Sequence, residues 1–207
     1  VVNNGIGMPL TAVRDLVNAS LVHLNFATNF PSNQNHTVTV NAVTDLAGNA
    51  ISNEIAVFSY FIPSPYSIVI DELMADPTPL VQLPDVEWLE LKNTTGFDIN
   101  LQNWRVGKST GVSGPMPNYI LKADSFVVVC TGSAVSSLSA FGPVISVTSF
   151  PSLNNTGDVL YLLSPQGNTI HSVSYTDAWY QNELKKDGGW SLEMIDTQNP
   201  CSGMSNW

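Results

Sequence analysis

Carboxylates gather in one stretch of the sequence, residues 71–90, as Asp71, Glu72, Asp76, Asp85, Glu87 and Glu90. Oxygen ligands at the junction of strands and loops could hold calcium, which takes about six to eight of them. The calcium ligands that this pattern predicts are Asp71, Glu72, Asp76 and Glu90. No EF-hand spacing accompanies them, and a solvated face with turn caps is the interpretation that we favour. It requires no cofactor.

Aromatic side chains could instead form a platform that stacks on sugar rings. Trp179 and Tyr180 are adjacent in a polar loop before Lys185, where we expect exposure. A carbohydrate-binding surface is one interpretation of this pair, and a structural plug that caps the fold is the favoured one. Trp104 and Trp190 alternate with apolar neighbours, so we expect both in the core.

Catalytic motifs are absent from the sequence. The three histidines, His23, His36 and His171, fall in no HExxH pattern, and there is no GxSxG, P-loop or GxGxxG. Gly111-Val-Ser-Gly114 lacks the spacing of a nucleophile elbow. We therefore expect no catalytic residues and no enzymatic activity.

Two cysteines leave two interpretations open. Cys130 closes an apolar strand pattern and Cys201 lies in a Pro-Cys-Ser-Gly turn. An even count in a chain with few lysines suits an extracellular or periplasmic protein with one disulfide. The alternative is two unpaired thiols, one of them buried.

Composition limits the partners. Seven Lys and Arg against seventeen Asp and Glu leave a formal charge of −10. Nucleic acids and anionic lipids need clustered cations, so we expect neither as a partner. No apolar run approaches the roughly 18–20 residues of a membrane helix, so we expect no transmembrane segment in this chain. The sequence begins in mid-pattern, and we expect it to be part of a longer protein.

Short alternating patterns separated by Gly, Asn, Pro and Ser predict an all-β fold without long helices. In the first part the expected strands are 21–28, 36–43 and 55–61. Between the last two, Asp45 and Asn49 supply turn chemistry and form a second calcium candidate, equal in standing to the first. In the second part the expected strands are 67–73, 86–92, 104–106, 125–130, 144–147, 158–163, 169–175 and 191–195. A hairpin turn is expected at 164–168 and a short helical turn within 133–141. Such a series of strands predicts an antiparallel β-sandwich.

The run Ile62-Pro-Ser-Pro-Tyr66 divides the chain. Two prolines donate few hydrogen bonds, so residues 63–66 are expected to be a linker. The predicted domains are residues 1–62 and 67–207.

The second domain resembles a known family. Residues 86–106, VEWLELKNTTGFDINLQNWRV, are similar to the start of the lamin tail domain, an immunoglobulin-like module. Further similarity lies in residues 68–77, in Asp187-Gly-Gly-Trp-Ser-Leu-Glu193 and in Asn199-Pro-Cys-Ser-Gly203. These last two resemble the form found in Bacteroidetes-type secreted proteins. The resemblance implies an immunoglobulin-like sandwich from bacteria that acts as a platform and not as a catalyst.

The first domain is a shorter match. Residues 36–50 resemble the C-terminal half of bacterial Ig-like domains of the surface-layer (SbsA-like) type. Such domains need about 100 residues, so a partial Ig-like module is expected here. Its open sheet edge must be covered by a neighbouring domain or another chain, which allows self-association.

These expectations combine into one hypothesis: a non-enzymatic structural or adhesion module of a larger extracellular, cell-surface or periplasmic protein. Its partner would be a protein or a polysaccharide at the cell surface. One alternative is a carbohydrate-binding module that uses Trp179 and Tyr180. Another is an accessory domain of a secreted hydrolase, since lamin tail modules are attached to such enzymes in bacteria.

Overall fold

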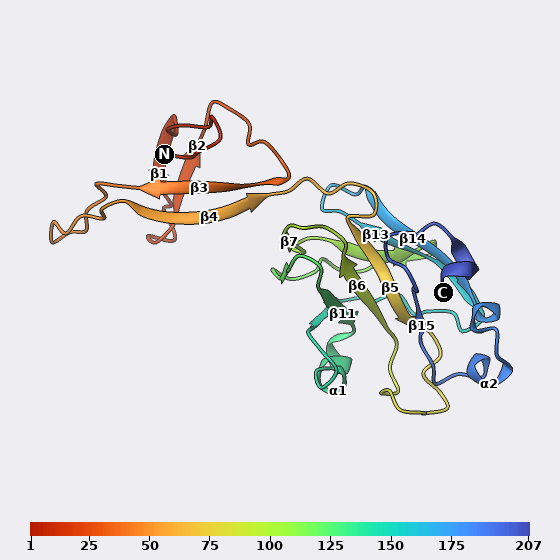
Figure 1. The fold of residues 1–207 in the computed structure, drawn as a ribbon. Coiled ribbons are helices and arrows are strands. Elements are labelled where there is room, and N and C mark those ends of the chain that lie inside the picture. The colour runs from red at the N-terminus through yellow and green to blue at the C-terminus, as the bar shows by residue number, and fades with distance from the viewer. The chain divides into compact units, whose positions relative to one another are not determined.

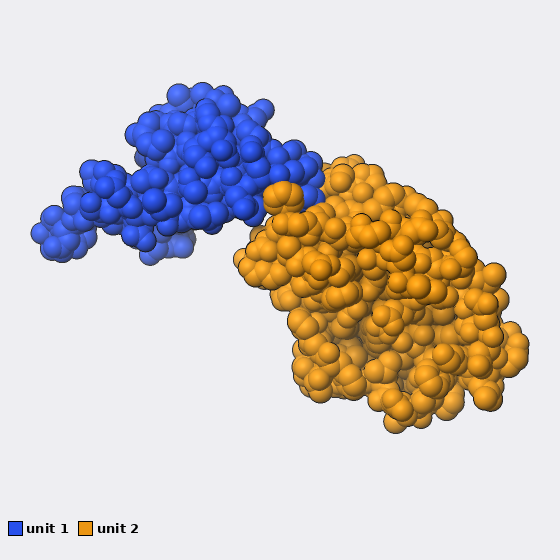
Figure 2. All heavy atoms as spheres, in the orientation of Figure 1, with its two compact units in different colours: residues 1–62 blue, residues 63–207 orange.

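The computed structural model describes all residues, 1–207, and divides into two compact units, Val1–Ile62 (unit 1) and Pro63–Trp207 (unit 2), which Figure 2 shows in two colours. The expected linker residues belong to unit 2, where the backbone N–H of Tyr66 donates to the carbonyl of Ile170 at 2.8 Å. None of the helices has the length and apolar character needed to span a membrane.

Unit 1 consists of two antiparallel hairpins (Figure 1). Its strands are β1 (Thr11–Arg14), β2 (Val22–Asn25), β3 (Gln34–Val40) and β4 (Glu54–Tyr60). β1 pairs with β2, and β3 pairs with β4 without a register shift. The expected strands correspond to β2, β3 and β4 within a few residues. The sequence pattern missed β1, which is short and exposed throughout.

Unit 2 is a sandwich of two main sheets. A five-stranded sheet has the order β12-β11-β6-β5-β15 and a four-stranded sheet has the order β14-β13-β8-β9. The strands of the first are β5 (Ile68–Met74), β6 (Trp88–Asn93), β11 (Phe126–Cys130), β12 (Val144–Ser146) and β15 (Leu192–Glu193). Those of the second are β8 (Arg105–Lys108), β9 (Gly111–Val112), β13 (Gly157–Leu163) and β14 (Thr169–Thr176). All neighbours are antiparallel except β11 and β12. The predicted all-β antiparallel sandwich is confirmed.

Smaller elements connect these strands. β7 (Ile99–Asn100) pairs with β10 (Ile120–Leu121). The helical segments are η1 (Gly132–Ala134), α1 (Val135–Leu138), η2 (Asp177–Tyr180), α2 (Glu183–Lys186) and η3 (Gly203–Asn206). The first two confirm the helical turn expected within 133–141. The hairpin turn at 164–168 is also confirmed, because the N–H of Ser164 donates to the carbonyl of Asn168.

Alternation along β6 creates two different faces of the five-stranded sheet. Leu89 and Leu91 are fully buried on the face toward the four-stranded sheet. Trp88 lies on the outer face in a second apolar cluster, whose members are Met74, Trp88, Val128, Cys130, Ala134 and Leu138. This cluster covers one half of the outer face. The other half carries Glu90 and is polar.

The end of β6 is fixed by one buried amide. Asn93 is fully buried, and its Nδ2 lies within hydrogen-bond distance of the carbonyls of Phe97, Leu121 and Lys122. Its Oδ1 accepts from the N–H and the hydroxyl of Thr95. A buried amide satisfied in this way holds the turn after β6 in one conformation. The polar middle of residues 86–106 is thus a structural element.

Candidate functional site

Carboxylates form a row across three strands of the polar outer face. Glu72 on β5 lies opposite Glu90 on β6, and Glu193 on β15 lies opposite Glu72. Asp71 occupies the adjoining β-bulge, where the register between β5 and β6 shifts. The structure thereby brings together three of the four predicted calcium ligands and adds Glu193. We call Asp71, Glu72, Glu90 and Glu193 the acidic row.

Burial and neighbouring carboxylates raise the pKa values of three members of this row, Asp71, Glu72 and Glu90. Burial, together with the charges of Glu72, Asp71 and Glu193 and against the opposing effect of Lys92, raises the pKa of Glu90 to about 7. Burial and the nearby Glu193 raise the pKa of Asp71 to about 6. Lys92 ion-pairs with Asp124 at 2.6 Å. The carboxyls of Asp71, Glu72 and Glu90 therefore release their protons at higher pH than exposed carboxyls do.

The carboxylates of the acidic row are not arranged to coordinate a metal ion. No three His, Cys, Asp or Glu side chains have an arrangement that could hold a metal ion. Asp76 lies elsewhere, where its Oδ1 faces the N–H and hydroxyl of Thr78. In unit 1, the side chain of Asp45 accepts from the N–H of Ala47 and from the N–H and side-chain amide of Asn49. Asp45 and Asn49 therefore act as a turn cap.

Trp179 and Tyr180 both make contacts within unit 2. The ring of Trp179 packs at 5.6 Å from that of Trp207, and both of the predicted platform rings are half-buried. The hydroxyl of Tyr180 donates to the carbonyl of Trp190 at 2.6 Å. These contacts hold the C-terminal segment against η2.

Trp190 is the exposed aromatic residue of this region. It is 39% exposed, so the expectation that it lies in the core is wrong. Its ring borders a pocket of about 360 Å³ whose lining is Val81, Gln82, Leu83, Phe141, Gly189, Trp190 and Ser191. Lys185 lies with its Nζ 4.9 Å from the ring centroid of Trp190, a cation–π contact. We call this site the Trp190 pocket.

Two glycines place Trp190 in this pocket. Gly188 and Gly189 have φ values of +109° and +78°, in the region that favours glycine. A Cβ on Gly189 would lie 2.1 Å from the carbonyl oxygen of Pro79, and the N–H of Gly189 donates to the carbonyl of Asp76. The sequence Asp187-Gly-Gly-Trp190 is therefore the feature that indicates the Trp190 pocket. It permits a close backbone contact that a side chain would prevent.

The two cysteines lie apart as free thiols, one buried and one exposed, which agrees with the second of the two interpretations. Cys130 is fully buried in the outer apolar cluster, and burial raises its pKa to about 11. Cys201 is exposed, with its Sγ 3.0 Å from the hydroxyl of Tyr66. The sequence could not indicate this separation, because it depends on which face of β11 carries Cys130.

The histidines occupy three separate environments. His23 pairs with Asp15 at 2.7 Å on the surface of unit 1. His36 is buried, and its Nε2 lies 2.9 Å from the carbonyl of Pro31. In unit 2, Nδ1 of His171 accepts the N–H of Ile70 at 2.9 Å, and burial lowers the pKa of His171 to about 4. None of the three is hydrogen-bonded to a Ser, Thr or Cys side chain.

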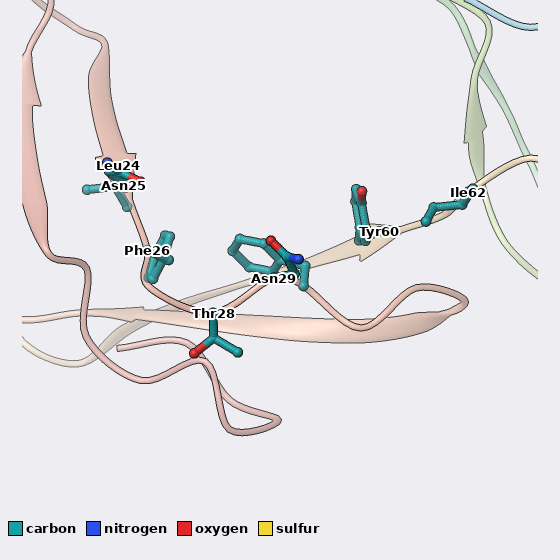
Figure 3. Close-up of a pocket in the computed structure, with 8 residues that line it drawn as sticks. Leu24, Asn25, Phe26, Thr28, Asn29, Tyr60 and Ile62 are labelled. Carbon is teal, nitrogen blue, oxygen red and sulfur yellow. The ribbon is translucent and has the colours of Figure 1, made fainter. Parts of the chain in front are cut away.

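Unit 1 has its own pocket, of about 480 Å³, shown in Figure 3. Its lining comes from the end of β2, the loop after it, and the end of β4: Leu24, Asn25, Phe26, Thr28, Asn29, Phe30, Tyr60 and Ile62. Phe30 is the centre of the neighbouring aromatic contacts, with ring centroids 5.2 Å from Phe26 and 5.7 Å from Phe58. The lining is mixed, with four apolar residues beside the polar groups of Asn25, Thr28, Asn29 and Tyr60.

Together, the two main sheets of unit 2 and the order of their strands define an immunoglobulin-like module. The family model described as the Lamin Tail Domain matches residues 63–177, more than half of the chain, and the chain therefore belongs to the lamin tail domain family. This family is non-catalytic in general. No curated protein matches the chain.

Proposed function

We propose that this chain is a non-enzymatic adhesion or structural module of a larger protein at the cell surface, outside the cell or in the periplasm. The observation that supports this proposal is the Trp190 pocket on the sandwich of unit 2. Trp is among the residue types that most often dominate the binding energy of protein interfaces. Unit 2 would hold such a pocket in place while the rest of the protein acts elsewhere.

A protein partner fits this pocket best. Val81, Leu83 and Phe141 supply apolar walls, and Trp190 supplies a large ring. Lys185 lies over that ring, where a sugar would otherwise stack. An apolar side chain of a partner could enter beside the ring without displacing the lysine. Trp179 and Tyr180, the alternative sugar-stacking pair, instead make contacts with Trp207 and Trp190 within unit 2.

Binding to cells of the organism that encodes the protein tests this proposal. Isotope-labelled chain is incubated with whole cells, and bound label is counted for the wild type, Trp190→Ala and Ile195→Ala. Ile195 is 76% exposed and is the matched control for loss of apolar surface. We expect Trp190→Ala to weaken binding by about 10-fold or more. Ile195→Ala should bind like the wild type.

Pretreatment of the cells identifies the class of partner. Protease treatment should abolish binding to cells, while periodate oxidation of surface glycans should leave it unchanged. Loss on periodate treatment alone would replace the protein partner with a polysaccharide. Equal binding by the wild type and Trp190→Ala, or no binding by either, would contradict the role of the pocket.

A further inference from the structure

β3 and β4 form a small sheet in unit 1 with one closed and one open edge (Figure 1). The outer edge of β3 bonds to the N-terminal residues, because the N–H of Thr39 donates to the carbonyl of Val1 and the N–H of Asn3 donates to the carbonyl of Thr37. Val2 and Val38 form the bridge between them. β4 pairs with β3 alone. Its other edge has no strand beside it.

The open edge presents a defined set of backbone groups. Because Thr37 and Thr39 direct their backbone groups away from β4, alternation directs those of their neighbours His36 and Val38 toward it. The cross-strand partners of Thr37 and Thr39 are Val57 and Ile55. The N–H and C=O groups of Ile55, Val57 and Ser59 therefore point outward from the sheet.

Protective features of edge strands are absent from β4. Natural edge strands are blunted by lysine, proline, bulges or covering segments. The six residues after Glu54, IAVFSY, contain no charge and no proline. All seven residues of β4 are exposed, including Ile55 at 60% and Val57 at 66%. This strand is exposed, mostly apolar and unpaired along one edge.

Unit 1 also has almost no hydrophobic core to stabilise it while β4 is exposed. Its buried side chains are only Val2, Ile6 and His36. A unit of about 60 residues is marginal even with a well-packed core. Additional burial on β4 would therefore stabilise the unit.

We propose that β4 pairs with β4 of a second copy of this chain, antiparallel and centred on Val57. In this register Val57 faces Val57 of the partner copy, and Ile55 faces Ser59. The outward backbone groups of these residues then bond one another, because each lies opposite another outward group. Two β3–β4 hairpins become one continuous four-stranded sheet. This inference concerns unit 1 and is independent of the Trp190 pocket in unit 2.

Charge favours the antiparallel arrangement. Glu54 is the only charged residue of β4, and the proposed register places it opposite Tyr60 of the other copy. A parallel, in-register pairing would instead place Glu54 opposite Glu54, and like charges directly opposite are destabilising. β4 is thus complementary to a second copy of itself in the antiparallel orientation. A closed two-fold dimer is the result.

Sedimentation of the full chain tests the association. We expect a monomer–dimer equilibrium over a concentration range of about 1–100 μM. Val57→Lys should shift the dimer dissociation constant upward by about 10-fold or more, because it places two positive charges face to face. Val13→Lys is the matched control, since Val13 is 57% exposed on the other hairpin of unit 1. This control should dimerise like the wild type.

Crosslinking tests the register. In a Cys201→Ser background, Val57→Cys and Ile55→Cys are each treated with a bis-maleimide of about 8 Å span. Two copies of position 57 should lie about 5–6 Å apart, and two copies of position 55 about 14 Å apart. We expect a covalent dimer for Val57→Cys alone. Equal crosslinking of both variants would overturn the antiparallel register, and a monomeric wild type at about 100 μM would overturn the interface.

Discussion

Units 1 and 2 are both built from short antiparallel strands, yet only unit 2 encloses a core. In unit 1 the buried apolar side chains are Val2 and Ile6, and all the others belong to unit 2. β4 is exposed along its whole length, whereas β5 is buried at every residue except the half-buried Glu72. Strand pairing alone therefore does not bury a strand. A second sheet against its face does.

The core of unit 2 provides the largest expected difference. Trp104 is 1% exposed, so Trp104→Ala should lower the free energy of unfolding by about 3–5 kcal/mol. Trp190→Ala is the matched control, because that ring is 39% exposed, and it should cost about 1 kcal/mol or less. Urea unfolding followed by tryptophan fluorescence measures both. All five tryptophans lie in unit 2, so the signal reports this unit alone.

Similar losses of unfolding free energy for Trp104→Ala and Trp190→Ala would contradict the distinction between a core residue and a surface residue. They would mean that Trp190 is buried in solution, for example by a partner copy. A change in stability that depends on protein concentration would reveal such a partner.

Buried charge in unit 2 gives the next largest effect. Lys108 on β8 and Asp158 on β13 form an ion pair at 2.7 Å, with side chains only 11% and 9% exposed. Lys108→Met leaves the carboxylate of Asp158 buried without its cation, so we expect a loss of about 3 kcal/mol. The exposed pair Lys122–Asp98 has the same 2.7 Å distance, and Lys122→Met should cost about 1 kcal/mol or less. Chemical denaturation of both variants provides the measurement, and equal losses would show that burial does not set the cost.

The acidic row predicts a smaller effect that depends on pH. The folded-state pKa values of Glu90, about 7, and Asp71, about 6, lie above the unfolded values of about 4. The folded state therefore favours the protonated forms. Their contribution to stability is fully present below about pH 4 and is lost as the pH rises toward 7. Other carboxylates oppose this trend at the acidic end, so the comparison is best made between pH 5 and pH 8.

We expect the acidic row to add on the order of 1 kcal/mol to the stability at pH 5 relative to pH 8. Buried His171 acts in the opposite direction, because its pKa of about 4 lies below the unfolded value and the unfolded state binds its proton first. Urea unfolding at the two pH values, followed by tryptophan fluorescence, measures this difference. Glu90→Gln is neutral at both values and should reduce the difference. If the stability of Glu90→Gln had the same pH dependence as that of the wild type, the acidic row would not cause the pH dependence.

Much of the architecture is readable from the sequence because alternation over five or more residues is a strong signal. β5, β11, β13 and β14 were expected within one residue or so of their observed ends. β7, β9 and β10 have two residues each, which is too short for any periodicity. Such strands exist because the surrounding fold brings them together. Local sequence does not encode them.

The site residues were harder to predict, because their roles depend on contacts distant in sequence. Glu193 joins the acidic row only through the pairing of β15 with β5, more than a hundred residues away. Trp190 was expected in the core from alternation, but β15 begins at Leu192. The preceding backbone is governed by Gly188 and Gly189, whose positive φ values no alternation rule describes. Glycine pairs before an aromatic residue are the signal that could have found it.

The smallest effect is expected on the surface of unit 1. Val13 on β1 is 57% exposed and faces solvent, so Val13→Thr should change the stability of unit 1 by less than about 0.5 kcal/mol. Unit 1 contains no tryptophan, so hydrogen exchange of the β1 and β2 amides is the suitable measurement. Unchanged exchange would agree with an open hairpin. Exchange that accelerates by 10-fold or more would mean that Val13 is buried by another part of the assembled protein, because exposed substitutions do not produce changes of that size.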